Sequence, residues 1–548
     1  FVVQLIRYYL VVDGDIVVNK SIKTYVKEGS KRNFTLEFKV PETNTIKQAE
    51  LFVRALRMRG RLEVDMVNYK EKINIIPYAN LSKLKKDIIV CDPNNSIKKQ
   101  LDAMKLGGVD KLTGDKIPAG KKLLIIGKDA YKSSMNGMLD KFTEAGNVVL
   151  MLAQKNWKPY RAELPERDPL HAATQSWIRR PDHPVVKGLD DSFVSFWHDD
   201  NVVSYETFIK PNVGSITSIL DCGGMFGMNW SPLLEVPLGK GAMLMTTLEL
   251  NQPDAAAGLL LERLIEYGCE RKSSVKTQLN LLAGKNEEMK EYLQMCGVVM
   301  NDGLGKSGPI LVDASADFKV SDLKKALDNG RTVWLHNFTP KTIGKVASLL
   351  PKGAKLEKVP KTVLGAMPVS DDKLIAGLSN FDFAWYRLRW SCPESIFKSA
   401  TPVTKPGDWV LNTKFYTGEA EKLTSPAFMT KIKAGKGTIL FDTLAWDKAV
   451  AKEPQKALRI ASGLLTNLGC EFKFAPKQHY KYSYVDLRKF ANMEYLDRVK
   501  GDGVGGWTDG GRADMRFFLI NHAGTGNGEL IGMAVDVDKF PENIRFND

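Results

Sequence analysis

Short apolar runs that lead into segments with helical spacing recur through the middle of the chain. The run IIVC opens IIVCDPNNSIKKQL (88–101), in which a polar turn separates it from an amphipathic segment. LLIIGKDAY (123–131) also opens with an apolar run, and in GKGAMLMTTLEL (239–250) the apolar run follows a Gly-Lys-Gly sequence. Apolar strands that alternate with helices of ten or more residues indicate βαβ units and a parallel sheet covered on both faces. The pattern therefore predicts a flavodoxin-like α/β sandwich.

The same succession of landmarks occurs a second time, about 190 residues later, a spacing that matches one whole domain. The three landmarks above correspond to LNLLAGKNEEMKEYL (279–293), ILVDASADF (310–318) and GKGTILFDTLAW (435–446). In both copies a helix is followed by a glycine and a further apolar strand, EAGNVVLML (144–152) and DNGRTVWLH (328–336). We therefore predict two tandem α/β domains, at 76–275 and 276–475.

The two ends of the chain have a different pattern. In RNFTLEFKV (32–40) apolar residues alternate with polar ones, and Asp13-Gly14 separates two further strand-like runs. This alternation predicts an antiparallel immunoglobulin-like β-sandwich over residues 1–75. Residues 476–548 are rich in glycine and aromatic residues, which predicts part of a second β-sandwich, of a galactose-binding-like kind.

Composition narrows the class of protein. The 548 residues carry 78 Lys and Arg against 64 Asp and Glu, a net charge of +14. The basic residues are scattered rather than gathered in a nucleic-acid-binding module, so we expect a solvated surface and no nucleic-acid partner. No stretch reaches the roughly 18 apolar residues of a membrane-spanning helix. The first residue is Phe1, and we expect the sequence to begin inside a longer protein.

The turns after the predicted strands are where α/β proteins usually place their chemistry. They offer no Gly-flanked Ser or Cys nucleophile. Ser315 and His336 form the one conceivable dyad, although a surface Ser and a strand-end His are far commoner without catalysis. Cys269 and Cys470 each follow a glycine, Gly268 and Gly469, that we expect to end a helix. We expect both cysteines to pack as small apolar residues. No spacing of Cys or His predicts a metal, and no cofactor is expected.

Other polar and aromatic residues are candidates for binding. Asp199, Asp200, Glu163 and Glu166 are available as carboxylates, but their spacing favours surface and capping roles. Aromatic residues are common at protein contacts. We therefore consider a protein interface formed by Trp197, His198, Asp199, Trp385 and Tyr386. For each Trp the alternative is a position in the core. Trp507, Asp509 and Arg512 could hold a sugar ring or simply stabilise a turn.

Several motifs together resemble a known family. HPVVKGL (183–189), FWHDDNVV (196–203), DCGGMFGMNWSPLLEVPLGKG (221–241) and GGWTDGGRADMR (505–516) are similar to the C-terminal accessory region of bacterial glycoside hydrolases of family two, the β-galactosidase-like group. The resemblance implies catalytic glutamates on a TIM barrel upstream of Phe1, and this barrel would be the chain's main partner. It also implies contact with polysaccharide, a homo-oligomer, and a periplasmic or secreted location if the parent protein has an export signal.

The α/β copies also resemble class I glutamine amidotransferases and the trimerisation domain of other β-galactosidases, but the amidotransferase nucleophilic Cys has no counterpart here. We therefore expect a non-catalytic region that positions or oligomerises a glycoside hydrolase. The alternative is a hydrolase or amidotransferase with an atypical site in one copy, which would depend on Ser315 and His336. A third hypothesis, binding of an anionic polymer, rests on the net charge alone.

Overall fold

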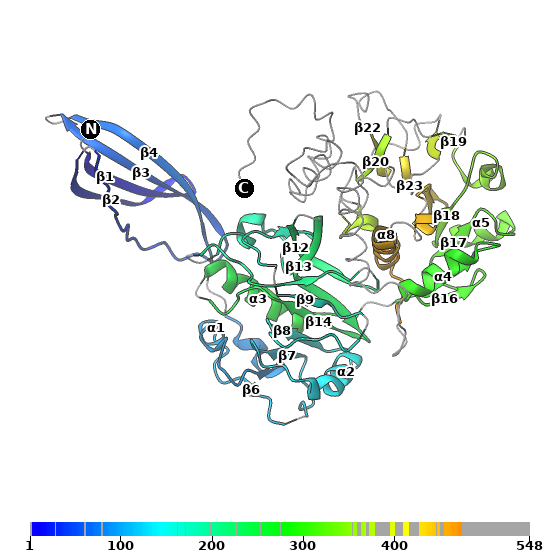
Figure 1. Ribbon diagram of the computed structural model, residues 1–548, viewed down its shortest axis with the longest axis horizontal. Helices are drawn as coiled ribbons and strands as arrows, with labels where there is room; N and C mark the ends of the chain where they lie inside the picture. The colour runs from blue at the N-terminus through cyan, green and yellow to red at the C-terminus, as the bar shows by residue number, and fades with distance from the viewer. Residues whose placement is uncertain are drawn as a thin grey trace, which may run out of the picture.

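The computed structural model describes residues 3–473 apart from gaps, the longest of which are 379–394, 400–408 and 416–426. The predicted C-terminal β-sandwich at 476–548 lies outside the described residues. The described chain forms one antiparallel β arm and two α/β units (Figure 1). None of its described helices combines the length and apolar character needed to cross a membrane.

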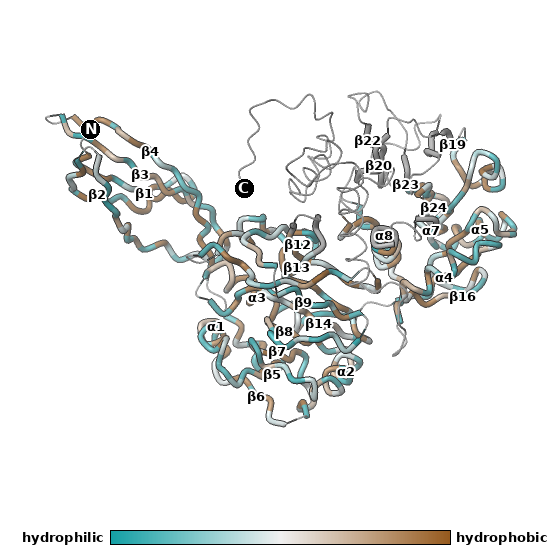
Figure 2. Tube along the Cα trace, viewed as in Figure 1, coloured by the Kyte–Doolittle hydropathy of each residue, from teal (hydrophilic) through white to brown (hydrophobic). Residues whose placement is uncertain are grey.

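The arm is a four-stranded antiparallel sheet of order β2-β1-β3-β4. Its strands are β1 (Val3–Val12), β2 (Asp15–Val26), β3 (Lys47–Arg59) and β4 (Leu62–Ile75). Asp13 and Gly14, with φ of 53° and 91°, form the two-residue turn between β1 and β2, a conformation that matches the twist of a hairpin. Figure 2 shows hydrophilic and hydrophobic residues mixed along these strands. The predicted antiparallel β structure is confirmed.

The prediction of a strand at residues 32–40 is wrong. This segment has no regular secondary structure. It lies against β1, where the Phe38 and Tyr8 rings are 6.4 Å apart and the Tyr8 hydroxyl donates a hydrogen bond to the Glu37 carbonyl. Phe34, Leu36 and Phe38 are half-buried while their neighbours are exposed. The alternation thus predicted which side chains turn inward, but not that the backbone would lie beside the sheet without pairing.

The first α/β unit has five parallel strands in its sheet. They are β5 (Ile88–Cys91), β6 (Asp110–Lys111), β7 (Leu123–Ile126), β8 (Val148–Met151) and β14 (Gly241–Thr246). Antiparallel strands extend the sheet beyond β14: β13 (Gly227–Leu238), β12 (Thr217–Gly224), β10 (Trp177–Ile178), β11 (Thr207–Ile209) and β9 (Glu166–Asp168). The helices are α1 (Lys98–Ala103), α2 (Asn136–Glu144) and α3 (Ala255–Glu270). Leucines of α1 and α3 join one hydrophobic cluster, and Leu139 and Phe142 of α2 join another. The sheet is therefore covered on both faces.

The second unit repeats this order of strands. Its parallel strands are β15 (Leu279–Leu282), β16 (Met300–Asp302), β17 (Ile310–Asp313), β18 (Thr332–His336) and β24 (Gly437–Asp442). Its antiparallel strands are β23 (Ala427–Ala434), β21 (Ser395–Ser399), β19 (Ala354–Lys358), β22 (Trp409–Phe415) and β20 (Val363–Pro368). The helices are α4 (Glu287–Cys296), α5 (Val320–Asp328), α7 (Trp446–Ala449) and α8 (Pro454–Asn467). Read from the parallel edge, β16-β15-β17-β18-β24-β23 matches β6-β5-β7-β8-β14-β13.

Matching glycines occupy matching turns. Gly239 and Gly435 have φ of 59° and 58° at the two Gly-Lys-Gly turns. A Cβ atom on Gly241 would lie 2.0 Å from the Asn147 carbonyl oxygen, and one on Gly437 would lie 2.3 Å from that of Arg331. Only glycine fits so close to a backbone oxygen. Both Gly-Lys-Gly motifs are therefore tight turns that lead into strands β14 and β24.

The first unit departs from the prediction at the end of its last helix. α3 continues through Gly268 to Glu270, so this glycine does not end the helix. A Cβ atom there would lie 2.7 Å from a methyl carbon of Leu123. The glycine lets the helix pack closely on β7. In the second unit Gly469 does follow the helix end, with φ of 77°.

Candidate functional site at the strand ends

Three polar residues meet at the carboxyl edge of the second sheet. Asp313, His336 and Asp442 are the last residues of β17, β18 and β24, which are neighbours in the parallel part of the sheet. Parallel strands all point their carboxyl ends to one edge, so residues far apart in sequence come together there. Asp447 of α7 joins them, since α7 begins just after β24.

His336 is fully buried and is held by two carboxylates. Its Nδ1 lies 2.7 Å from Asp442 Oδ2 and its Nε2 lies 3.1 Å from Asp447 Oδ1. Its ring stacks on Trp446, with centroids 4.4 Å apart. Burial alone would lower the pKa of His336, but the charges of Asp442 and Asp447 outweigh it and raise the pKa to about 10. The ring is therefore an imidazolium at neutral pH, with both nitrogens donating.

The two carboxylates nearest the surface are tied together by two amides. Asn286 Nδ2 donates to Asp313 Oδ2 at 3.1 Å and to Asp447 Oδ2 at 2.9 Å. Asn337 Nδ2 donates to the same two oxygens at 2.9 and 2.7 Å. Each of these Oδ2 atoms thus accepts two hydrogen bonds, one for each lone pair. These contacts and the His336 charge hold the pKa of Asp447 well below its usual value, although burial acts in the opposite direction.

The hypothesis that Ser315 and His336 form a catalytic dyad is wrong. The Ser315 hydroxyl donates to Asp313 Oδ1 at 2.6 Å, and the Ser315 backbone N–H bonds the same oxygen at 2.8 Å. Both nitrogens of His336 are occupied by Asp442 and Asp447. A base must have a free lone pair within reach of the hydroxyl proton, and His336 has none. The nucleophile–base pair on which the alternative hypothesis depended is therefore absent from these two residues.

A cavity of about 550 Å³ opens over this network. It is lined by Lys285, Asn286, Glu287, Glu288, Asp313, Ala314, Ser315, Asn337, Thr342 and Asp447. Within the described parts of the chain, no group of three or more His, Cys, Asp or Glu side chains is placed to hold a metal ion. Four of the residues that line the cavity, Asn286, Asn337, Asp313 and Asp447, are hydrogen-bonded to one another.

The same edge of the first unit is built differently. Counted from the matching Gly-Lys-Gly turns, Leu152 takes the place of His336 and Thr246 that of Asp442. An ion pair lies nearby: Lys128 Nζ is 2.9 and 2.7 Å from the two carboxylate oxygens of Glu249, which is buried. A charged network at this edge is therefore a feature of the second unit rather than of the fold.

The described cysteines have the character of core residues. Burial raises the pKa of the Cys269, Cys296 and Cys470 thiols to about 12. Cys222 is also buried, and desolvation raises its pKa as well. A thiol reacts as its thiolate, which these groups do not supply near neutral pH. Cys269 and Cys470 lie in the hydrophobic clusters of the two units, as predicted.

Trp197 was a candidate interface residue, and its indole is instead in the core of the first unit. It is 2% exposed and its Nε1 donates to the Phe193 carbonyl at 3.1 Å. The neighbouring Phe196 is exposed, with a φ of 56° that is rare outside glycine. His198, Asp199, Trp385, Tyr386, Trp507, Asp509 and Arg512 lie outside the described residues.

The described carboxylates that were weighed as candidate acids take part in local contacts. Glu163 pairs with Arg161 at 2.6 Å. Asp200 accepts a hydrogen bond from the Val202 N–H and contacts the Tyr205 hydroxyl. Glu166 lies in β9, which pairs with β11. Asp200 agrees with a surface or capping role, whereas a surface role for Glu163 is wrong, because this residue is 7% exposed and forms a buried ion pair.

Asp313, Asp442 and Asp447 are site residues that the sequence motifs did not predict. A signal was present, since an acidic residue closes the apolar runs ILVD (310–313) and ILFD (439–442), and His336 closes VWLH (333–336). A charged residue at the end of a fully apolar strand indicates a polar strand edge. The corresponding runs of the first unit, LLII and MLMT, contain no charged residue.

Comparison with known proteins gives remote structural similarity. No protein-family model and no curated protein matches the chain. A β-galactosidase from Bacillus circulans sp. alkalophilus shares 12% identity over 39% of this chain and 34% of its own, with a TM-score of 0.21. The exo-β-1,4-mannosidase Op5Man5 from Opitutaceae bacterium strain TAV5 shares 10% identity over 40% of each chain, with a TM-score of 0.21. A β-galactosidase from Rahnella sp. R3 shares 8% identity over 66% of this chain and 55% of its own, again with a TM-score of 0.21. The aligned part is less than two thirds of each of these proteins.

Proposed function

We propose that this chain is a non-catalytic accessory region of a β-galactosidase-like glycoside hydrolase, which positions or oligomerises the catalytic domain. The observation that carries the proposal is the closed hydrogen-bond network of Asp313, His336, Asp442 and Asp447. The acid and base groups best placed for chemistry in the second unit are bound to one another or to the two amides. Such a network stabilises the strand edge and engages the side chains of Asp313, His336, Asp442 and Asp447 in internal hydrogen bonds, which supports a structural role for them.

The class of parent enzyme comes from the sequence motifs. The HPVVKGL and DCGG-to-GKG segments resemble family-two glycoside hydrolases, and the β-galactosidases and mannosidase named above fit this assignment. His183 of HPVVKGL has a structural role here: its Nε2 lies 3.1 Å from Glu235 Oε2, and its ring packs edge-on against Tyr267. The motif anchors a loop to β13 and α3, as a scaffold requires.

We further propose that the two α/β units are tandem, amidotransferase-like copies of one ancestral domain. Their matched strand order and their matched glycine turns support this. The partner would be a catalytic barrel in the same parent protein, with polysaccharide as a second contact. A weak sugar site is sufficient for such a role, because tethering beside a catalytic domain raises its effective affinity.

Activity assays on the full chain test the proposal. The purified protein is incubated with nitrophenyl β-galactoside and β-mannoside, and its migration is followed in gels that contain polysaccharide. We expect no turnover above that of buffer. Turnover that Asp313→Asn or Asp447→Asn abolishes would overturn the proposal, and Glu163→Gln, which alters a carboxylate far from the strand edge in sequence, serves as the control.

Retention in the gel tests the second half of the proposal. Migration that slows as polysaccharide is added would support the sugar contact. Unchanged migration with every polysaccharide would remove that contact and leave only the positioning role, for which size-exclusion chromatography with light scattering reports the oligomeric state.

A further inference from the structure

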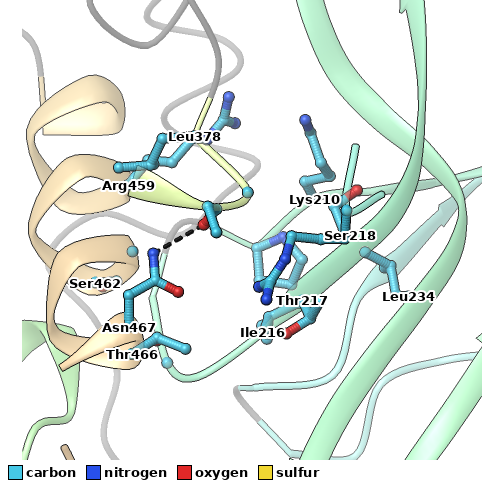
Figure 3. Close-up of a pocket in the computed structure, with 16 residues that line it drawn as sticks. Lys210, Ile216, Thr217, Ser218, Leu234, Leu378, Arg459, Ser462, Thr466 and Asn467 are labelled. Carbon is cyan, nitrogen blue, oxygen red and sulfur yellow. Dashed lines mark hydrogen bonds between the residues drawn. The ribbon is translucent and has the colours of Figure 1, made fainter. Parts of the chain in front are cut away.

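A second cavity lies between the two α/β units (Figure 3). Lys210, Thr217 and Ser218 reach it from the first unit, and Arg459 and Thr466 reach it from α8 of the second. The units also meet next to it, where the Gly214 N–H donates to the Cys296 carbonyl at 3.2 Å and Val213 packs on the second core. The cavity is therefore part of a packed junction. Its inner volume is about 60 Å³, the size of a small molecule or ion.

The lining of this junction cavity is cationic. Arg180, Lys210 and Arg459 line it, and none of the other described residues in its lining is acidic. Arg180 uses Nε and Nη2 for an ion pair with Asp182, at 2.9 and 3.0 Å, which leaves Nη1 outside that pair. The Arg180 side chain lies beside Gly377, where a Cβ atom would be 3.5 Å from its Cδ. This places a guanidinium of the first unit directly against the second.

Behind the lining, two cations share one buried carboxylate. Lys210 Nζ lies 3.0 Å from Asp221 Oδ1, and Arg179 Nε lies 2.5 Å from Asp221 Oδ2. Asp221 is fully buried, and these two charges lower its pKa against the effect of burial. One negative charge thus faces two positive ones on this side of the cavity.

Hydroxyl groups complete the lining. Ser462, which is 4% exposed, and Thr466 each have a buried hydroxyl oxygen without a hydrogen-bond partner. The polar neighbour of the Ser462 hydroxyl is the Cys296 thiol, and sulfur is only a weak hydrogen-bond partner. Buried polar atoms are nearly always paired in folded proteins, so two unpaired hydroxyls beside three cations indicate a place for a polar ligand. Neighbouring Asn467 is fixed by donating to the Leu374 and Ala376 carbonyls, both at 2.8 Å.

We propose that the junction cavity binds one oxyanion: a sulfate, phosphate or carboxylate group. Guanidinium groups match the planar or tetrahedral oxygens of such anions, and ammonium and hydroxyl groups supply further donors. The group belongs either to a free inorganic ion or to an acidic sugar, such as a sulfate ester or a uronate. Its ligands come from both units, so binding joins them. This inference is independent of the accessory role proposed above.

Titration of the full chain tests the proposal. Isothermal calorimetry and thermal melts are recorded with inorganic sulfate, with galactose 6-sulfate and with galacturonate, at constant ionic strength held with chloride. We expect sulfate to bind and to raise the melting temperature, as a ligand of the native state does. Tighter binding of galactose 6-sulfate or galacturonate than of sulfate identifies an acidic sugar as the ligand, and equal or weaker binding identifies the free ion.

Variants locate the site. Arg459→Gln and Arg180→Gln each remove a charge from the cavity, and we expect each to weaken sulfate binding about tenfold. Arg54→Gln is the matched control, because Arg54 makes the same two-bond ion pair with an exposed Asp, Asp65, in the β arm. Unchanged affinity in both cavity variants, or equal weakening in the control, would overturn the proposal.

A measurement on the unaltered protein covers the case in which the variants fail to fold. Crystals soaked in selenate are examined for anomalous density. A peak within reach of Arg180, Lys210 and Ser462 supports the proposal. An empty cavity at saturating selenate, together with no binding in the titration, contradicts it.

Discussion

The two α/β units have the same strand order but different chemistry at the carboxyl edge. At matching positions the first unit has Leu152, directly after β8, and Thr246, the last residue of β14, whereas the second unit has His336 and Asp442. The first edge has the buried Leu152 and Thr246 at these positions and a single Lys128–Glu249 ion pair nearby, whereas the second has a buried network of one cation and three carboxylates. The comparison shows that a strand edge can be closed in either way on the same scaffold, so the presence of acids and a base there does not by itself indicate catalysis.

The largest expected effect comes from removing the cation. His336→Ala leaves Asp442 and Asp447 buried without their counter-charge, which costs about 3–5 kcal/mol. Urea unfolding followed by hydrogen exchange, which reports each unit separately, measures the loss. We expect it in the second unit and not in the first.

A matched triple variant sharpens this prediction. His336→Leu with Asp442→Thr and Asp447→Asn brings in residues of the kind found in the first unit and removes the charges together. A buried ion network can often be replaced by uncharged residues with little loss, so the triple variant should be more stable than His336→Ala. A triple variant as unstable as the single one would show that the network does more than close the edge.

The pH dependence of stability should also distinguish the units. The pKa of His336 is raised from 6.5 to about 10, so its stabilisation is complete below pH 6.5 and is lost as the pH rises toward 10. In the first unit, the His183 hydrogen bond and the Arg271 charge outweigh burial and lower the pKa of Glu235 to about 2. Its stabilisation is complete above pH 4.5 and is lost as the pH falls toward 2. Hydrogen exchange at pH 9 should therefore show added opening in the second unit first. The same opening in His336→Leu would contradict the assignment.

Glu235→Gln should lower the free energy of unfolding by a smaller amount, about 2 kcal/mol. The amide keeps the shape of the carboxylate but loses the charge that faces Arg271 and His183. The expected loss is confined to the first unit. Thermal melts at pH 7 and pH 4 measure it, and the difference between variant and parent should shrink at pH 4. A difference that does not depend on pH would show that packing, rather than charge, accounts for it.

The smallest effect is expected for Ser315→Ala. The hydroxyl donates a hydrogen bond to Asp313 and accepts one from the Lys285 N–H, and because this position is partly exposed its loss costs about 1 kcal/mol. We expect no change in any enzymatic turnover of the parent protein. A loss of turnover beyond the loss of folded protein would restore a catalytic role for this residue.

Much of the fold follows from the sequence because the apolar runs are short and regular. The runs at 88–91, 123–126, 310–313 and 332–336 are all strands, and the glycines after α2 and α5 end those helices. The prediction of a strand at residues 32–40 is wrong for a physical reason. The alternation of apolar and polar residues specifies which side chains face a core, whereas backbone pairing depends on a neighbouring strand that the sequence does not identify. Gly268 was misjudged as a helix end because its role is close packing against Leu123.

The site could be predicted only in part. Ser315 and His336 were found because they follow strands, but their partners come from distant segments. Asp442 lies 106 residues from His336, and Asp447 lies 111 residues from it. Sequence spacing alone does not show whether an imidazole will face a hydroxyl or two carboxylates, and that choice decides between a base and a buried cation.

Hydrogen bonds join the segment before the first strand of the second unit to the residues that follow its last helix. These contacts affect the order in which this unit folds during synthesis on the ribosome. Just before β15, the Thr277 N–H donates to the Gly469 carbonyl and Thr277 forms a bridge with Cys470. Contacts of such long sequence separation form late, because the intervening chain must first be made and then closed. The first unit, whose last helix ends at Glu270, can be complete while the second is still being translated. A pause in synthesis before Cys470 would leave Thr277 without this partner, so the closing contacts of the second unit depend on the residues that follow α8.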